Sequence, residues 1–129
     1  MIPGGLKILL AIEPIDMRRS IDGLIVAVAE RLKKDAAAER ALYVFANQRR
    51  DRIKILWRDA TGWCLLYKRL EGARATLPEI DAGAVSVHVD ARTLASILDG
   101  TKLRPTAREI VREAREKVAA PAPILKARA

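Results

Sequence analysis

The stretch NQRRDRIKILWRDATGWCLLYKRLE, residues 47–71, decides the fold. Ile53, Ile55 and Trp57 occupy every second position of its first half, and this period is typical of a β-strand with two different faces. The tetrapeptide DATG then begins with Asp and ends with Gly, which is a preferred composition for a β-turn. The alternation resumes in WCLLYKRL. The stretch therefore predicts a β-hairpin.

Other segments extend this hairpin into a domain. ALYVFAN (residues 41–47) is rich in β-formers and predicts a third strand of an antiparallel meander, while LKILLAI (6–12) and VSVHV (85–89) predict two more. Apolar residues at helical spacing predict a helix through residues 21–32, in which Gly23 suggests close packing against the sheet. We predict one α+β domain, an antiparallel sheet of about four to five strands with helices packed on one face.

Two helices complete the prediction. Asp90 is a suitable N-cap for ARTLASILDG, and Gly100 is a suitable end for that helix. After Pro105, TAREIVREAREKVA predicts a charged helix with a thin apolar stripe and i,i+4 ion pairs, followed by a frayed tail. We therefore divide the chain into a domain over residues 1–104 and a helical extension over residues 105–129.

The charge of the chain is high and uneven. Its 129 residues carry a net charge of +8. Residues 47–74 hold 8 basic and 3 acidic side chains, and residues 102–129 hold the same numbers. A basic excess favours polyanionic partners but says little about the fold.

Catalytic and metal-binding residue patterns are weak in this sequence. Cys64 and His88 are the only residues of their types and lack the spacing of metal ligands. Cys64 lies among apolar residues, so we interpret it as a buried small hydrophobe, and His88 as an outward-facing strand residue. The aspartates have capping or turn roles. We expect no enzyme activity, no metal and no cofactor.

The single cysteine and the apolar runs also bear on the compartment. Cys64 cannot form an intrachain disulfide, which favours a reducing compartment. We find no apolar run near the roughly 20 residues that span a bilayer, and no signal-peptide pattern at the start. We therefore expect a cytoplasmic protein that does not enter a membrane.

The basic side chains of the hairpin are the candidate functional residues. Phosphate groups pair well with arginine and lysine, and nearby aromatic rings could stack on bases. The alternation assigns Trp57 to the core and leaves Trp63 open. The same charges could instead form a solvated sheet face. The candidate DNA-binding residues are Arg49, Arg50, Arg52, Lys54, Arg58, Lys68 and Arg69.

Three motifs resemble those of a known family. DMRRSIDGL (16–24), YVFANQRRDRIKILWRDATGWCLLYKRLE (43–71) and PEIDAGAVSVHVDARTLASILDG (78–100) resemble the accessory proteins, called TnpB, of the IS sixty-six family of bacterial insertion sequences. The resemblance covers about residues 1–104. The chain departs from the family pattern at Ser20, at Arg58 and in EGARAT.

This resemblance implies a role in transposition beside a separate transposase that carries the catalytic residues. We expect a non-catalytic accessory protein that binds DNA, such as the ends of the element, through the basic hairpin region. The alternative is a protein adaptor, in which Arg58 and Trp63 dock the transposase or a second copy of the chain without contacting DNA.

Overall fold

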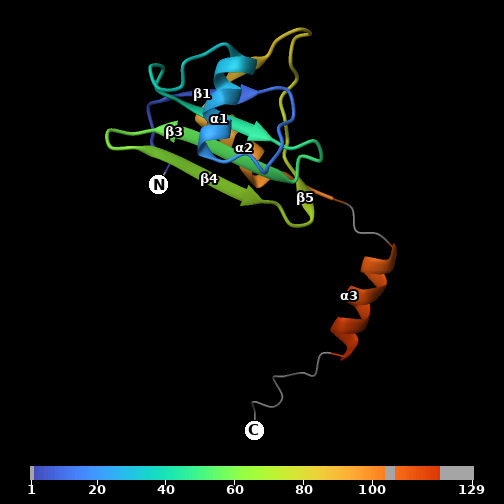
Figure 1. Cartoon of the computed structure of the whole chain (residues 1–129). Helices are drawn as coiled ribbons and strands as arrows, with labels where there is room; N and C mark the ends of the chain where they lie inside the picture. The colour runs from blue at the N-terminus through green and yellow to red at the C-terminus, as the bar shows by residue number, and fades with distance from the viewer. Residues whose placement is uncertain (1, 104–106, 120–129) are drawn as a thin grey trace.

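A five-stranded sheet forms the centre of the computed structural model, which describes residues 2–103 and 107–119 (Figure 1). The strands lie in the order β4-β3-β2-β1-β6. Their bounds are Lys7–Ala11 for β1, Ala41–Ala46 for β2, Arg52–Arg58 for β3, Trp63–Arg69 for β4 and Ser86–Val89 for β6. The α+β class is confirmed.

The sheet is mixed, whereas we predicted an antiparallel one. Strands β2, β3 and β4 form the predicted antiparallel meander, and β6 runs antiparallel to β1. However, β1 pairs with β2 in parallel. A parallel pair needs a long crossover, and the chain supplies one in α1 (Ile21–Ala27) and the π-helical turn η1 (Val28–Leu32).

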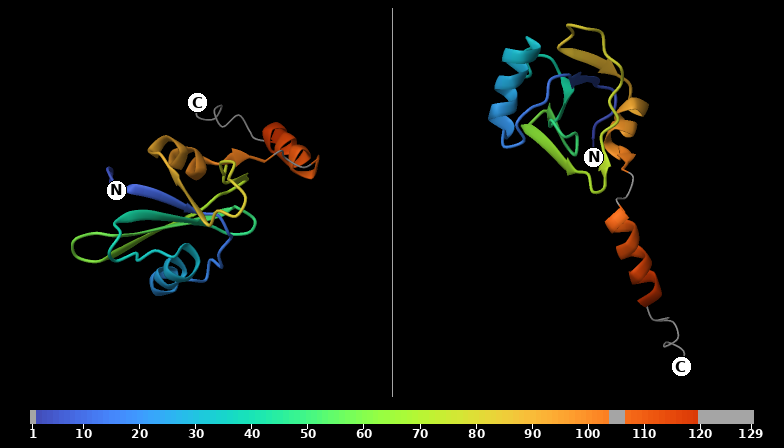
Figure 2. Two further views of the ribbon diagram at one scale, coloured as in Figure 1. Left: turned by 90° about the horizontal axis from the view of Figure 1, so that it is seen from above. Right: turned by 90° about the vertical axis from the view of Figure 1, so that its right-hand side faces the viewer.

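Helices cover both faces of the sheet, which corrects the prediction that they share one face. Figure 2 shows α1 and α2 (Ala91–Asp99) on opposite sides. Each helix packs on its own apolar cluster, with Leu24 of α1 in one and Ile97 of α2 in the other. The cause lies in β2, whose side chains are buried on both faces, so both faces need a cover.

The predicted alternation in the hairpin is confirmed. Ile53, Ile55 and Trp57 belong to the cluster beneath α2, and Leu56 belongs to the cluster beneath α1. Trp57 is buried, as the alternation indicated. Trp63 is half-buried on the α1 face.

The end of α2 joins a small second sheet that we did not predict. Asp90 caps the helix as expected, because its carboxylate accepts a hydrogen bond from the backbone N–H of Thr93 at 2.7 Å. Gly100 ends it at a φ of 70°, and a Cβ there would lie 2.6 Å from the carbonyl oxygen of Arg74. This close approach allows β7 (Thr101–Lys102) to pair with β5 (Ala73–Arg74).

The predicted charged helix is present as α3 (Ala107–Ala119). Its described side chains are all exposed, including those of Ile110, Val111 and Val118 in the apolar stripe. The predicted domain boundary at 104/105 and the predicted frayed tail lie outside the described residues. Among the helices described, none has the length and apolar character needed to cross a membrane.

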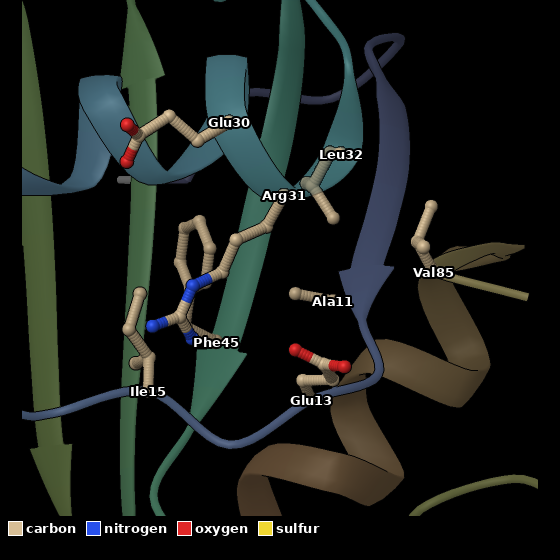
Figure 3. A pocket seen from close by; sticks show the side chains of 8 residues that line it. All are labelled: Ala11, Glu13, Ile15, Glu30, Arg31, Leu32, Phe45 and Val85. Carbon is tan, nitrogen blue, oxygen red and sulfur yellow. The ribbon is translucent and has the colours of Figure 1, made fainter.

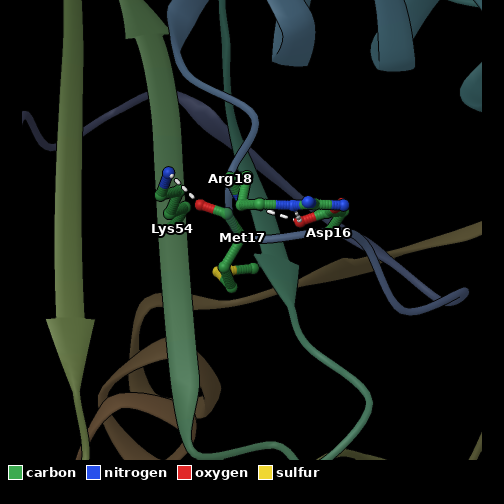
Figure 4. Close-up of polar contacts among 4 residues, drawn as sticks. All are labelled: Asp16, Met17, Arg18 and Lys54. Atoms are coloured by element: carbon green, nitrogen blue, oxygen red, sulfur yellow. Dashed lines mark hydrogen bonds and ion pairs between the residues drawn. The ribbon is translucent and has the colours of Figure 1, made fainter.

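Lys54 lies in the core, so its predicted exposure is wrong. Its side chain is 6% exposed on the α1 face of β3. The ammonium donates a hydrogen bond to the carbonyl oxygen of Met17 at 2.7 Å (Figure 4) and another to that of Arg19 at 2.6 Å. It also lies 4.9 Å from the centre of the Tyr67 ring. The segment that leads into α1 therefore covers this part of the sheet and binds the lysine.

Replacing Lys54 tests this arrangement. Lys54→Met leaves two carbonyl groups without their donor, and we expect the free energy of unfolding to fall by about 2–4 kcal/mol. The matched control is Lys68→Met on the next strand, where an exposed ammonium makes one bond to the Leu98 carbonyl oxygen. Urea unfolding compares the two, and equal losses would contradict a structural role for Lys54.

Tyr43 makes the stability of the fold depend on pH in the alkaline range. Its ring is fully buried, and its hydroxyl donates to the carbonyl oxygen of Glu39 at 3.0 Å. Burial and, secondarily, the carboxylate of Glu39 raise the pKa of Tyr43 to about 12. The unfolded chain ionises its tyrosines near pH 10.

Because the folded pKa is the higher one, this stability is complete below about pH 10 and is lost as the pH rises toward about 12. We expect unfolding free energy, measured by urea titration at successive pH values, to fall across this window. Tyr43→Phe should flatten the fall, and an unchanged slope in that variant would contradict the assignment.

Candidate functional site

The turn between β2 and β3 exposes two of the predicted arginines, Arg49 and Arg50, to solvent. The side-chain oxygen of Asn47 accepts hydrogen bonds from the backbone N–H groups of Asp51 and Arg52, both at 3.0 Å. Its amide nitrogen donates to the Asp51 carboxylate at 2.7 Å, and this bond is the main cause of the lowered pKa of that carboxyl. Arg49 and Arg50 lie exposed on the closed turn, Arg50 at a φ of 59°.

The turn is also fixed to the chain that follows β4. The backbone N–H of Leu70 donates to the carbonyl oxygen of Asp51 at 2.7 Å, and that of Ala75 donates to the carbonyl oxygen of Arg50 at 2.6 Å. These bonds give the exposed arginines a rigid base.

Arg52 and Arg69 lie directly opposite each other at this end of the sheet. Like charges in such a pair repel. Arg69 has an exposed partner, since its Nε donates to Glu71 at 2.9 Å. The Nε of Arg52 is buried without a hydrogen-bond partner among the described residues. Both arginines line an open hollow of about 390 Å³ with Glu71 and Tyr67, whose side chain is 51% exposed.

The seven predicted residues therefore do not form one surface. Lys54 is buried, and Lys68 points to the opposite face, where its ammonium donates to the Leu98 carbonyl oxygen at the end of α2 at 2.8 Å. Arg58 lies at the opposite end of β3 from Arg52, beside the turn that leads into β4. The remaining four define what we call the arginine end: Arg49, Arg50, Arg52 and Arg69.

The predicted docking pair does come together. The guanidinium carbon of Arg58 lies 5.6 Å from the centre of the Trp63 ring, and the two residues are directly opposite across β3 and β4. Cation–π contacts of this kind hold both side chains in place. Arg58 is exposed and Trp63 is half-buried.

Arg18 is an exposed cation that the sequence analysis did not select. It is 91% exposed and binds the Asp16 carboxylate at 2.7 Å, which lowers the pKa of Asp16 to about 2. The carbonyl oxygens of its two neighbours, Met17 (Figure 4) and Arg19, accept hydrogen bonds from the Lys54 ammonium. The sequence analysis used DMRR (residues 16–19) only as part of a family motif and did not consider Arg18 as a candidate.

Gly23 serves Arg19 rather than the sheet. A Cβ at Gly23 would lie 3.2 Å from the Cβ of Arg19, and the Arg19 guanidinium donates to the Gly23 carbonyl oxygen at 3.2 Å. Our expectation that this glycine allows close packing against the sheet is therefore wrong. It makes room for the arginine side chain across the first turn of α1.

Cys64 lies on β4 and His88 on β6, the two opposite edges of the sheet. Cys64 is half-buried, and its thiol contacts the Asp59 carboxylate at 3.5 Å. Burial, and then the carboxylate, raise the pKa of this thiol, which disfavours the nucleophilic thiolate. His88 is exposed on edge strand β6, as predicted. Within the described ranges, no cluster of metal-binding side chains occurs.

A pocket that the sequence did not indicate lies where β1 ends against η1 (Figure 3). Its volume is about 220 Å³. Apolar side chains such as Phe45 form part of its wall, while Glu13, Glu30 and Arg31 are its charged members. Arg31 donates to the Pro14 carbonyl oxygen at 3.1 Å. The π-helical turn places Glu30 and Arg31 at the pocket, and such turns are frequent at functional sites.

Comparison with known proteins places the chain in a family. The family model described as IS66 Orf2 like protein matches residues 6–108. The uncharacterized protein y4jC of Sinorhizobium fredii is 31% identical over 101 residues, which span 78% of this chain and 86% of the relative. The uncharacterized protein y4hO of the same organism is 32% identical over 89 residues, spanning 67% and 76%. No solved structure matches the chain significantly. The chain therefore belongs to the IS66 Orf2-like family, a family of proteins associated with insertion sequences.

Proposed function

We propose that this chain is a non-catalytic accessory protein of transposition that binds DNA through the arginine end. The observation that carries the proposal is the pair formed by Arg52 and Arg69. Two guanidinium groups oppose each other across the hairpin, and one of them has a buried Nε without a partner among the described residues.

A phosphate group would offset the repulsion between these residues. It would place negative charge between the two cations, and its oxygens would accept N–H groups of the guanidinium forks. Arg49 and Arg50 would reach neighbouring phosphates from the rigid turn. Tyr67, half-exposed in the same hollow, adds an aromatic surface beside the cations. Phosphate contacts position a protein on DNA without reading its sequence, so this binding should be weakly sequence-specific.

The proposal uses fewer cations than the sequence suggested. The ammonium groups of Lys54 and Lys68 are already bound to backbone carbonyl oxygens of the same chain. With four arginines left, the slope of log K against log salt should be about −3 to −4, because each neutralised phosphate contributes about −0.9.

Salt titration of binding to element-end DNA tests this proposal. Arg52→Gln should weaken binding at low salt and reduce the steepness of the salt dependence by about 0.9, the contribution of one phosphate. Arg58→Gln is the matched control, because it makes the same change at the other end of the same strand. It should leave both quantities unchanged. A flat salt dependence, or equal effects of the two variants, would contradict binding through the arginine end.

A protein adaptor is the second candidate function. The cation–π pair of Arg58 and Trp63 supports it, because arginine and tryptophan are the residue types that most often anchor protein interfaces. In this case the chain docks the transposase and does not contact DNA. Co-purification with the transposase should then be lost in Trp63→Ala and retained in Arg49→Ala. The reverse pattern would count against the adaptor.

A further inference from the structure

Strand β4 is the outermost strand on one side of the sheet, so one of its edges has no neighbouring strand in the part of the chain that the structure describes (Figure 1). It is seven residues long. A regular edge strand of this length is a template for pairing with another strand. Natural proteins usually shorten such edges, bend them or cover them.

The backbone groups that face this open edge can be identified. At the two ends of the β3–β4 ladder, Leu70 N–H donates to the Asp51 oxygen and Asp59 N–H donates to the Gly62 oxygen. Hydrogen-bonded pairs alternate along an antiparallel ladder. The even-numbered residues of β4 therefore bond to β3, and the odd-numbered residues turn their N–H and C=O groups outward. The outward-facing residues are Trp63, Leu65, Tyr67 and Arg69.

We propose that two copies of this chain pair through β4, antiparallel, about a two-fold axis at Leu66. In this register Trp63 lies opposite Arg69 of the second copy, and Leu65 lies opposite Tyr67. Every outward-facing residue of β4 then has a hydrogen-bonding partner, which gives about eight backbone hydrogen bonds across the axis. The two sheets become one continuous sheet.

The side chains fit this register. On the α1 face, an arginine meets a tryptophan and a leucine meets a tyrosine, which are favourable cross-strand pairs. On the α2 face, Leu66 meets its own copy and Cys64 meets Lys68. No like charges are opposed. Tyr67, exposed in the single chain, becomes covered.

Other registers of the antiparallel β4–β4 pair are less favourable. A slip of one residue sets outward-facing groups against groups already bonded to β3. A shift of the axis to Leu65 or Tyr67 leaves an outward-facing residue of each strand without a partner. A shift of the axis to Lys68 sets this lysine against its own copy, and like charges directly opposite are destabilising.

Sedimentation of the full chain at increasing concentration tests the pairing. We expect a dimer that dissociates on dilution. Tyr67→Pro removes an outward N–H without touching the β3–β4 ladder, and proline is tolerated at such edge positions. It should raise the dimer dissociation constant at least about tenfold. Tyr67→Ala is the control for loss of the ring and should weaken the dimer less.

Disulfide formation tests the register independently. In a Cys64→Ser background, Leu66→Cys places two cysteines in a non-hydrogen-bonded pair with Cα atoms ~4.5 Å apart, within the range of a disulfide. Mild oxidation should link two copies. Lys68→Cys in the same background should not, because its copy lies several residues away along the strand.

Two outcomes would overturn the proposal. One is a chain that stays monomeric at high concentration and forms no link through Leu66→Cys. The other is a dimer whose dissociation constant is the same in Tyr67→Pro and Tyr67→Ala and whose copies link equally well through Lys68→Cys. A chain that is monomeric alone but binds the transposase in a Tyr67→Pro-sensitive manner would assign the edge to a strand of that partner instead.

Discussion

The buried ammonium of Lys54 is the constraint on which the arrangement of this domain depends. An unpaired charge in a protein core is strongly unfavourable, so its position requires partners. Here the partners are two carbonyl oxygens, those of Met17 and Arg19, together with the face of Tyr67. The segment before α1 must therefore lie across β3. That placement seats α1 on the sheet and turns the side chain of Arg18 into solvent.

The cations of the hairpin consequently have three different uses. Lys54 joins two distant segments of the chain, and Lys68 binds the carbonyl end of α2. Only the arginines at the turn and at the strand ends remain for an external partner. The net positive charge of residues 47–74 is therefore larger than the number of cations that remain available to bind a polyanion. The difference between lysine and arginine is consistent with this division, since a lysine presents a compact ammonium whereas a guanidinium presents a fork of donors.

Local patterns in the sequence were enough to predict part of this structure. The alternation around Trp57, the turn at Asp59 and the cap at Asp90 depend on neighbouring residues, and each is confirmed. The features that we missed depend on distant segments. The parallel pairing of β1 with β2, the placement of helices on both faces and the pairing of β5 with β7 require knowledge of which elements meet. Lys54 alternates with apolar residues, a pattern that predicted an exposed side chain. It is a core residue only because the segment before α1 covers it.

The two proposed interfaces use different parts of β4. The guanidinium groups of the arginine end project from a face of the sheet, whereas pairing between copies uses backbone groups in the plane of the sheet. Arg52 lies on β3 and takes no part in the pairing edge. Arg69 belongs to both, because its side chain is in the arginine end and would also lie opposite Trp63 of the second copy, while its backbone is on the open edge. In an antiparallel pair, the two arginine ends would lie at opposite ends of the joined strands, roughly 20 Å apart for a strand of this length. Paired copies could therefore contact phosphates at two separated positions, and binding at one would raise the effective concentration at the other.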